Sequence, residues 1–168
     1  MALAIFATFS WIGYGALRHD FAVLITNLFV GTGQLIVLRA LIYHRKLQLH
    51  WVLGIALACS ALIILARATD PAVVGLSASL LGVLNLIPQV REAVRSDRLD
   101  GISVMSYVLF VVAVVSWIGY ALAHHDYVVL GANILVLPLA LVVLARILQT
   151  RKNAILEAIA VDDCFAAA

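Results

Sequence analysis

Long apolar stretches alternate with short polar breaks along the whole chain. Each stretch is close to the roughly 20 residues that an α-helix needs to cross the hydrocarbon core of a bilayer, although the first and third are short. The apolar stretches are residues 1–17, 21–43, 51–66, 72–90, 103–123 and 127–149. This pattern predicts an all-α, polytopic membrane protein with about six transmembrane helices.

The composition supports the same fold class. Of the 168 residues, 65% are hydrophobic and only 12% are charged, and the mean hydropathy is +1.11. Soluble domains carry about 25% charged residues, which form their polar surface. A helix can be apolar on every face only where its surroundings are apolar too. We therefore expect an integral membrane protein whose main partner is the lipid bilayer.

Other classes of function find little support in the residues. A net charge of +2, scattered along the chain, does not indicate a nucleic-acid interface. The predicted spans hold no paired carboxylates, no His and Cys cluster and no Ser-His-Asp set. Gly31 and Gly33 lie inside an apolar helix with no strand before it, so they do not indicate a dinucleotide loop. We predict a protein that is not an enzyme and has no metal or cofactor.

Basic residues indicate the orientation. If the N-terminus is cytoplasmic and all spans cross, only Arg18 and Arg67 fall in outer turns. The other nine fall in inner segments: Arg39, Arg45, Lys46, Arg91, Arg95, Arg98, Arg146, Arg151 and Lys152. Because cytoplasmic loops retain Lys and Arg, both termini are expected to be cytoplasmic. The expected location is the plasma (inner) membrane.

An internal repeat relates the two ends of the chain. A shift of 106 residues places the block SWIGY at 10–14 on the same block at 116–120, and Asn27 on Asn133. Over residues 1–46, 18 of 46 positions are identical. Identities of Leu and Val are weak in membrane spans, but a block with a Trp, followed by an Asn at the same distance, indicates a true repeat.

The two copies are expected to cross the membrane in the same direction, because both have a His-Asp outer turn and an Arg-Lys inner end. Parallel copies of a three-helix unit need one extra crossing between them, which the span at 51–66 supplies. The predicted segments are a first repeat of two helices at 1–46, a linker helix at 47–70, a complete three-helix repeat at 71–152 and a cytoplasmic tail at 153–168.

The second copy carries an ordered set of motifs. They are Pro88-Gln89 at the end of a helix, Gly101-x-Ser103 after a basic loop, Trp117-x-x-Tyr120 on the next helix and Asn133 on the third. This order resembles the PQ-loop repeat of the SWEET and SemiSWEET sugar transporters. The resemblance covers residues 90–152 well, extends back to Pro71 and recurs in 1–46, and so includes most of the chain.

The resemblance implies a fold and an activity. Two three-helix bundles, joined by a linker helix, would face each other across a central pocket, which is a recognised transporter architecture. The implied activity is passive, alternating-access transport of a small sugar, a mono- or disaccharide. The first repeat departs from the pattern because it has no Pro-Gln helix. We expect either that this helix precedes Met1 in a longer chain or that a partner or second copy completes the bundle as a homo-oligomer.

Asn27, Asn133, Trp11 and Trp117 are the main candidates for substrate binding. Each Asn can offer a donor and an acceptor to sugar hydroxyls, or can instead hydrogen-bond between helices. Each Trp can stack on the apolar face of a pyranose, or can belong to the aromatic belt at the membrane surface. Two symmetric copies that match the family's pocket positions favour substrate contact.

Pro88 and Gln89 form the candidate hinge. Proline removes a backbone donor, so Pro88 either ends its helix or kinks it and lets the inner end swing. Gln89 is then expected to cap the freed backbone. Asn85, one turn earlier, is a further candidate for the substrate pocket.

Four other polar positions receive structural interpretations. Asp20 and Asp126 are expected to be solvated helix caps in the outer turns. Ser10 is expected to pack or to bond back to its own helix. Gln34 has no polar counterpart in the second repeat, and either bonds between helices or contacts a helix that this chain does not contain.

Two alternative functions remain. A PQ-loop carrier of amino acids or other metabolites would need groups for a carboxylate and an ammonium, and the spans offer little charge for them. A non-transporting membrane protein that kept the fold would be consistent with the absent Pro-Gln helix. No Asp or Glu lies within a predicted span, which argues against coupling to protons.

Overall fold

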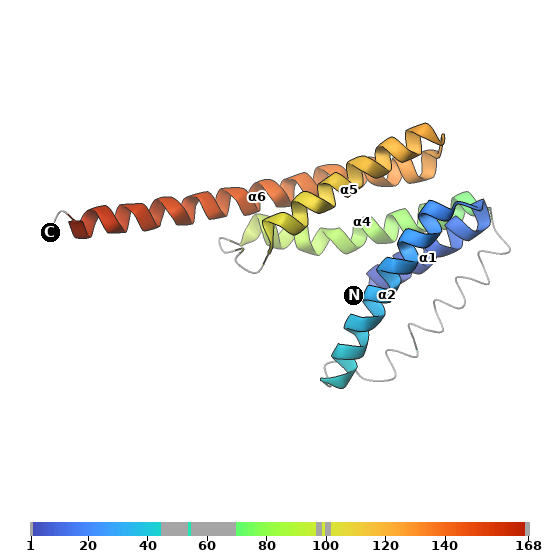
Figure 1. Cartoon of the computed structure of the whole chain (residues 1–168), viewed down its shortest axis with the longest axis horizontal. Helices are drawn as coiled ribbons and strands as arrows, with labels where there is room; N and C mark the ends of the chain where they lie inside the picture. Colours follow the sequence, from blue (N-terminus) through green and yellow to red (C-terminus); the bar gives the residue numbers. More distant parts are fainter. Residues whose placement is uncertain (1, 45–53, 55–69, 97–98, 100–101, 167–168) are drawn as a thin grey trace. The chain divides into compact units, whose positions relative to one another are not determined.

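In the computed structural model, all residues are described except 1, 45–53, 55–69, 97–98, 100–101 and 167–168. The described part contains α-helices and no strand. The helices are α1 (Ala2–Arg18), α2 (Phe21–Tyr43), α4 (Pro71–Arg95), α5 (Val104–Ala123) and α6 (Tyr127–Ala166) (Figure 1). The all-α prediction is confirmed. The predicted span at 51–66 lies outside the described residues, apart from Gly54.

Four of these helices are long and apolar enough to cross a membrane: α2, α4, α5 and the part of α6 from Tyr127 to Leu156. Their large apolar side chains are widely exposed, with Phe29 at 76% and Ile36 at 67%. Such surfaces are stable only against lipid or another apolar partner. α1 has 17 residues, which at about 1.5 Å per residue is slightly shorter than a ~30 Å hydrocarbon core. The chain is an integral membrane protein.

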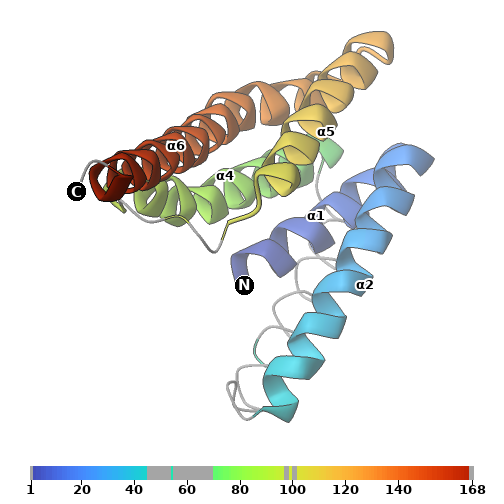
Figure 2. The same cartoon turned by 60° about the vertical axis from the view of Figure 1, so that its left-hand side comes forward.

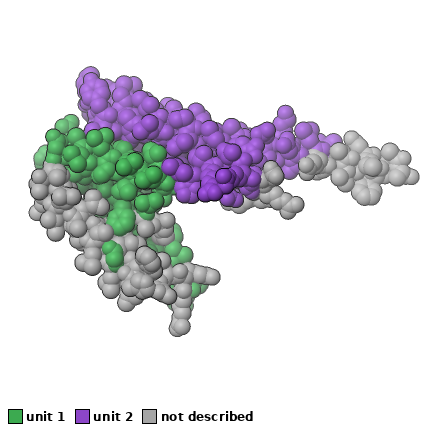
Figure 3. Space-filling view, turned by 180° about the vertical axis from the view of Figure 1, so that it is seen from behind, with its two compact units in different colours: residues 1–85 green, residues 86–168 purple. Residues whose placement is uncertain are grey.

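The chain forms two compact units, residues 1–85 and 86–168 (Figure 3). The boundary falls inside α4, between Asn85 and Leu86. Each unit contains one pair of packed helices, α1 with α2 and α5 with α6. Figure 2 shows each pair as an antiparallel hairpin.

The turn between α1 and α2 stops one helix and starts the next within two residues. His19 has a φ of 54°, the left-handed conformation that often ends helices. The backbone N–H of Asp20 donates to the Gly15 carbonyl at 2.8 Å and that of His19 to Ala16 at 3.3 Å, which is the pattern of a Schellman motif. The Asp20 carboxylate then accepts from the Val23 N–H at 3.0 Å as the N-cap of α2.

The turn between α5 and α6 repeats this geometry 106 residues later. His125 also has a φ of 54°, and the Asp126 N–H donates to the Ala121 carbonyl at 2.9 Å. The Asp126 carboxylate accepts from the N–H groups of Val128 and Val129, both at 3.0 Å. Both aspartates are caps as predicted, but Asp126 is only 6% exposed. The expectation that it is solvated was wrong, because its two hydrogen bonds draw it against the helix end.

Unit 2 also contains residues 86–95 of α4. Ala93 on α4 packs with Val143 and Ile147 on α6, and Leu99 completes this fully buried cluster. The Arg146 guanidinium reinforces the contact, with Nε donating to the Ala93 carbonyl at 3.1 Å. Since the last carbonyls of a helix have no partner within it, this bond stabilises the end of α4.

Two of the predicted helix ends are not observed. α4 continues past Pro88 to Arg95, so Pro88 lies inside the helix and does not end it. α6 continues through Pro138 and beyond residue 152 to Ala166, so most of the predicted tail at 153–168 is part of the same helix.

The buried cap at Asp126 provides a test of the second turn. Asp126→Ala should lower the free energy of unfolding by about 1–2 kcal/mol, since two N–H groups lose their acceptor in a buried site. Asp126→Asn keeps an acceptor oxygen and is the control. Thermal unfolding in detergent micelles measures both. Equal melting temperatures for the two variants would show that the side-chain oxygen does not stabilise this turn.

Candidate functional site

Asn27 and Asn133 have the same local geometry. The Asn27 Nδ2 donates to the Val23 carbonyl one turn earlier at 2.8 Å, and the Asn133 Nδ2 donates to the Val129 carbonyl at 2.8 Å. Both side chains are half-buried. This single bond holds the carboxamide in place and leaves its oxygen and its second N–H available to a ligand hydroxyl.

The two tryptophans also have matching environments. Trp11 contacts Tyr14 edge to face, with ring centroids 5.5 Å apart and an interplanar angle of 89°. Trp117 contacts Tyr120 in the same way, at 5.3 Å and 81°. Such pairs are favourable beyond their buried area, so the tyrosine of each pair fixes the orientation of the indole ring.

The site residues are divided between the units. Trp11 and Asn27 lie on α1 and α2 of unit 1, and Trp117 and Asn133 lie on α5 and α6 of unit 2. Within the part of each unit that is described, no hydrogen bond or ring contact joins the Trp to the Asn. Asn85 is half-buried on α4 and makes no side-chain hydrogen bond with any described residue.

Gln89, in the candidate hinge, makes a different contact from the one predicted. The Gln89 Oε1 accepts a hydrogen bond from the Tyr107 hydroxyl at 2.7 Å, which links α4 to α5. Among the described residues, the Gln89 side chain makes no hydrogen bond to the backbone carbonyl that Pro88 leaves without a donor. The sequence pattern placed the Pro-Gln pair correctly on a helix but gave no signal for Tyr107 as its partner.

Unit 1 contains a polar contact that sequence reasoning only partly anticipated. The Gln34 Nε2 on α2 donates to the Thr8 Oγ1 on α1 at 2.9 Å and lies 3.4 Å from the Ala4 carbonyl. The Gln34 side chain therefore forms a hydrogen bond between two helices, which is the first of the two interpretations that the sequence allowed for it. The Gln34 Oε1 is buried and has no hydrogen-bond partner among the residues that the structure describes.

Comparison of the two repeats reveals the signal that would have identified Thr8. Thr8 and Gln34 align with Val114 and Ala140, so both positions are polar in one repeat and both are apolar in the other. A joint change of this kind indicates contact between the two positions. Val114 and Ala140 are both buried, at 3% and 0% exposure.

The serines next to the tryptophans differ. The Ser116 Oγ donates to the Val112 carbonyl at 2.8 Å, as expected for a hydroxyl in an apolar helix. The Ser10 Oγ is buried and has no hydrogen-bond partner among the described residues, which fits the packing role, the first of the two expected for it.

One face differs between the two hairpins. On α6, Val143 and Ile147 are fully buried against Ala93 of α4 and against Leu99. The equivalent residues on α2 are Val37 and Leu41, and Val37 is 54% exposed. The first hairpin thus exposes part of the surface that α4 covers in the second.

A known protein shares this sequence pattern. The chain is 38% identical over 79 residues to a protein of Escherichia coli (strain UMEA 3162-1) described as sugar transporter SemiSWEET, and the match covers 47% of this chain and 89% of that protein. The chain belongs to the SemiSWEET sugar transporter family. The SemiSWEET relative is about half as long as this chain, which is consistent with the internal repeat. No family model and no solved structure matches the chain.

The Thr8–Gln34 contact can be tested by exchanging residues between repeats. Thr8→Val and Gln34→Ala should each destabilise unit 1, because each leaves a buried polar partner unpaired. The double variant reproduces the apolar pair of the second repeat and should recover part of the loss, with a coupling of roughly 0.6–2 kcal/mol. A double-mutant cycle of unfolding free energies measures this coupling. Additive losses would show that the two side chains do not interact.

Proposed function

We propose that this chain carries a small sugar across the membrane by passive alternating access. The observation that supports this most strongly is the paired geometry of its two hairpins. Each hairpin presents an Asn fixed by a 2.8 Å bond to its own helix and a Trp held by a Tyr. The SemiSWEET relative is described as a sugar transporter, and these residue types suit the chemistry of a sugar.

In each hairpin, the proposed binding residues suit the two surfaces of a sugar ring. Asn27 and Asn133 each accept from one hydroxyl through Oδ1 and donate to another through the free N–H. Trp11 and Trp117 offer flat apolar surfaces to the C–H face of the ring. Asn85 adds a further amide from α4. Because the amides and indoles are held in place before the sugar arrives, little side-chain entropy is lost on binding.

Release requires the inner ends of the helices to move, and Pro88 is the proposed hinge. The proline removes one hydrogen bond from the middle of α4, and the boundary between the compact units lies one turn before it. The Tyr107–Gln89 bond, at 2.7 Å, crosses from α5 to the residue that follows this weak point. We infer that this bond couples α5 to the movement of the inner half of α4.

The exposed side chain of Val37 on α2 offers a surface on which another helix can pack. Since α4 covers the equivalent residues in unit 2, a helix with a similar packing surface fits against Val37. We propose that a second copy or another helix packs there, which makes a homo-oligomer one way to complete the carrier. The proposed location is the plasma (inner) membrane, with both termini cytoplasmic.

Amide variants test the proposed site. Asn133→Ala and Asn27→Ala should each lower kcat/KM for sugar uptake by roughly 3- to 10-fold, the effect of losing one hydrogen bond to a bound hydroxyl. Uptake of labelled mono- and disaccharides by a transport-deficient host measures this effect.

Thr32→Ala is the matched control for these variants. The Thr32 hydroxyl lies on α2 and donates to the Leu28 carbonyl one turn earlier at 2.9 Å, the same type of bond that Asn27 makes. Its removal should leave uptake unchanged. If the Asn variants transport as well as Thr32→Ala, with equal amounts of protein in the membrane, the two amides do not bind the substrate.

A further inference from the structure

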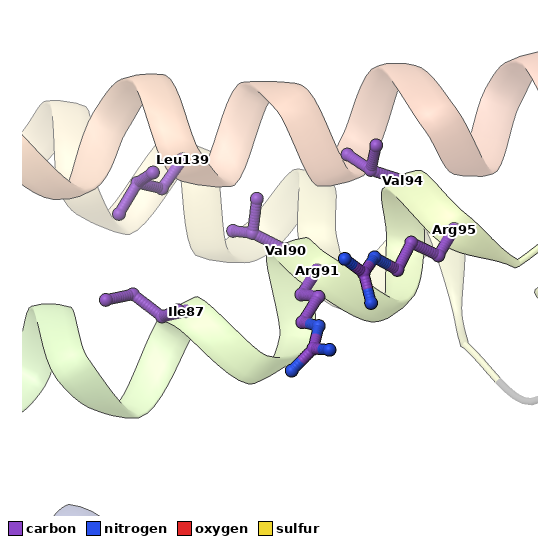
Figure 4. A pocket seen from close by; sticks show the side chains of 6 residues that line it. All are labelled: Ile87, Val90, Arg91, Val94, Arg95 and Leu139. Atoms are coloured by element: carbon purple, nitrogen blue, oxygen red, sulfur yellow. The ribbon is translucent and has the colours of Figure 1, made fainter.

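A cavity of about 280 Å³ lies between α4 and α6 within unit 2 (Figure 4). It is separate from the proposed sugar-binding residues, since neither an Asn nor a Trp lines it. Its lining residues are Ile87, Val90, Arg91, Val94, Arg95 and Leu139. The wall of the cavity is apolar, and the two arginines contribute mainly their carbon chains to it, with their charged ends beside it.

Apolar and basic residues alternate along the part of α4 that lines the cavity. Arg91 follows Val90, Arg95 follows Val94, and Ile87 lies one turn before Arg91, with Leu139 across the cavity. From residue 87 to residue 95 the helix rises about 12 Å. The stretch begins with the apolar Ile87 and ends with the cationic Arg95, and long arginine side chains near a helix end can reach the headgroup region while their carbon chains stay against the apolar wall.

The two arginines are available to a ligand. Arg91 and Arg95 are exposed, and Figure 4 shows both guanidinium groups on the same side of α4. Neither forms a hydrogen bond or ion pair with any residue in the described part of the chain. Arg146 is different, because its guanidinium is already bonded to the carbonyls of Ala93 and Val94 at 3.1 and 3.4 Å. Arg146 stabilises the helix end, whereas Arg91 and Arg95 have no such structural role.

We propose that this cavity binds a phospholipid with an anionic headgroup. The guanidinium groups of Arg91 and Arg95 bind the phosphate through charge-assisted hydrogen bonds, for which the planar fork of arginine is well suited. A segment of one acyl chain lies against Ile87, Val90 and Leu139. A free phosphate ion would use only the arginines and gain nothing from the apolar wall. The apolar half of the cavity therefore favours a lipid.

If α4 moves at Pro88 as proposed, a lipid bound here makes that movement depend on the lipid composition of the membrane. Pro88 lies between Ile87 and Val90 in the wall, so a bound lipid contacts both sides of the proposed hinge. The binding claim does not depend on sugar transport, and it is tested without it.

Native mass spectrometry of the purified full-length chain in detergent micelles measures the affinity for phosphatidylglycerol and phosphatidylcholine. The chain should prefer phosphatidylglycerol. Arg91→Gln combined with Arg95→Gln should weaken that affinity by roughly 25-fold, about 5-fold for each arginine. The control combines Arg39→Gln with Lys152→Gln, which removes the same charge from exposed positions outside the cavity. It should bind phosphatidylglycerol as the parent chain does.

A second variant tests the apolar wall. Ile87 is 47% exposed, so Ile87→Trp can fill the cavity without disturbing the core. It should weaken phosphatidylglycerol binding while both arginines remain, and inorganic phosphate should not compete at equal concentration. Equal loss of affinity in the control double variant, or full affinity in Ile87→Trp, would overturn the proposal in favour of unspecific attraction to charge. Competition by inorganic phosphate alone would overturn the lipid assignment.

Discussion

The structure depends on one constraint, which is that hydrocarbon offers no hydrogen bonds to a peptide group. Each polar group within a span must therefore find its partner in the protein. The helices satisfy their own backbones, and the two hairpin turns satisfy helix ends through Schellman bonds and aspartate caps. The same requirement explains why Asn27 and Asn133 bond to their own helices and why Gln34 reaches across to Thr8. Two buried atoms of unit 1, the Ser10 Oγ and the Gln34 Oε1, are exceptions, since neither has a hydrogen-bond partner in the described part of the chain.

The internal repeat gives the two hairpins the same local geometry. Because the turn geometry recurs after 106 residues, each hairpin presents its Asn and Trp in the same local setting. The two repeats also differ at positions that pack between helices. Thr8 and Gln34 form a polar contact where the second repeat has an apolar pair. Val37 is exposed where its counterpart Val143 is buried beneath α4. The hairpins are thus equivalent at the proposed site and different in what packs behind it.

Most of the described helices could be predicted from the sequence, because the length of each apolar stretch and the internal repeat are strong signals. Helix ends at the His-Asp turns followed from charge, whereas the burial of Asp126 did not, since it depends on a second N–H bond formed only in the folded turn. Pro88 was correctly placed on a helix, but tertiary packing of α4 on α6 carries that helix beyond it. Contacts between helices, such as Tyr107 with Gln89, need the packing itself and have no local pattern.

The central claim is that the chain itself carries sugar without an energy source. Proteoliposomes that contain only the purified chain test it most directly, by counterflow of a labelled sugar against an excess of the unlabelled one. The account predicts counterflow well above that of empty liposomes, with the same rate when a proton gradient is imposed or collapsed, because no predicted span carries a carboxylate. Counterflow equal to that of empty liposomes, for each sugar tested and with the chain shown to be folded, would contradict it.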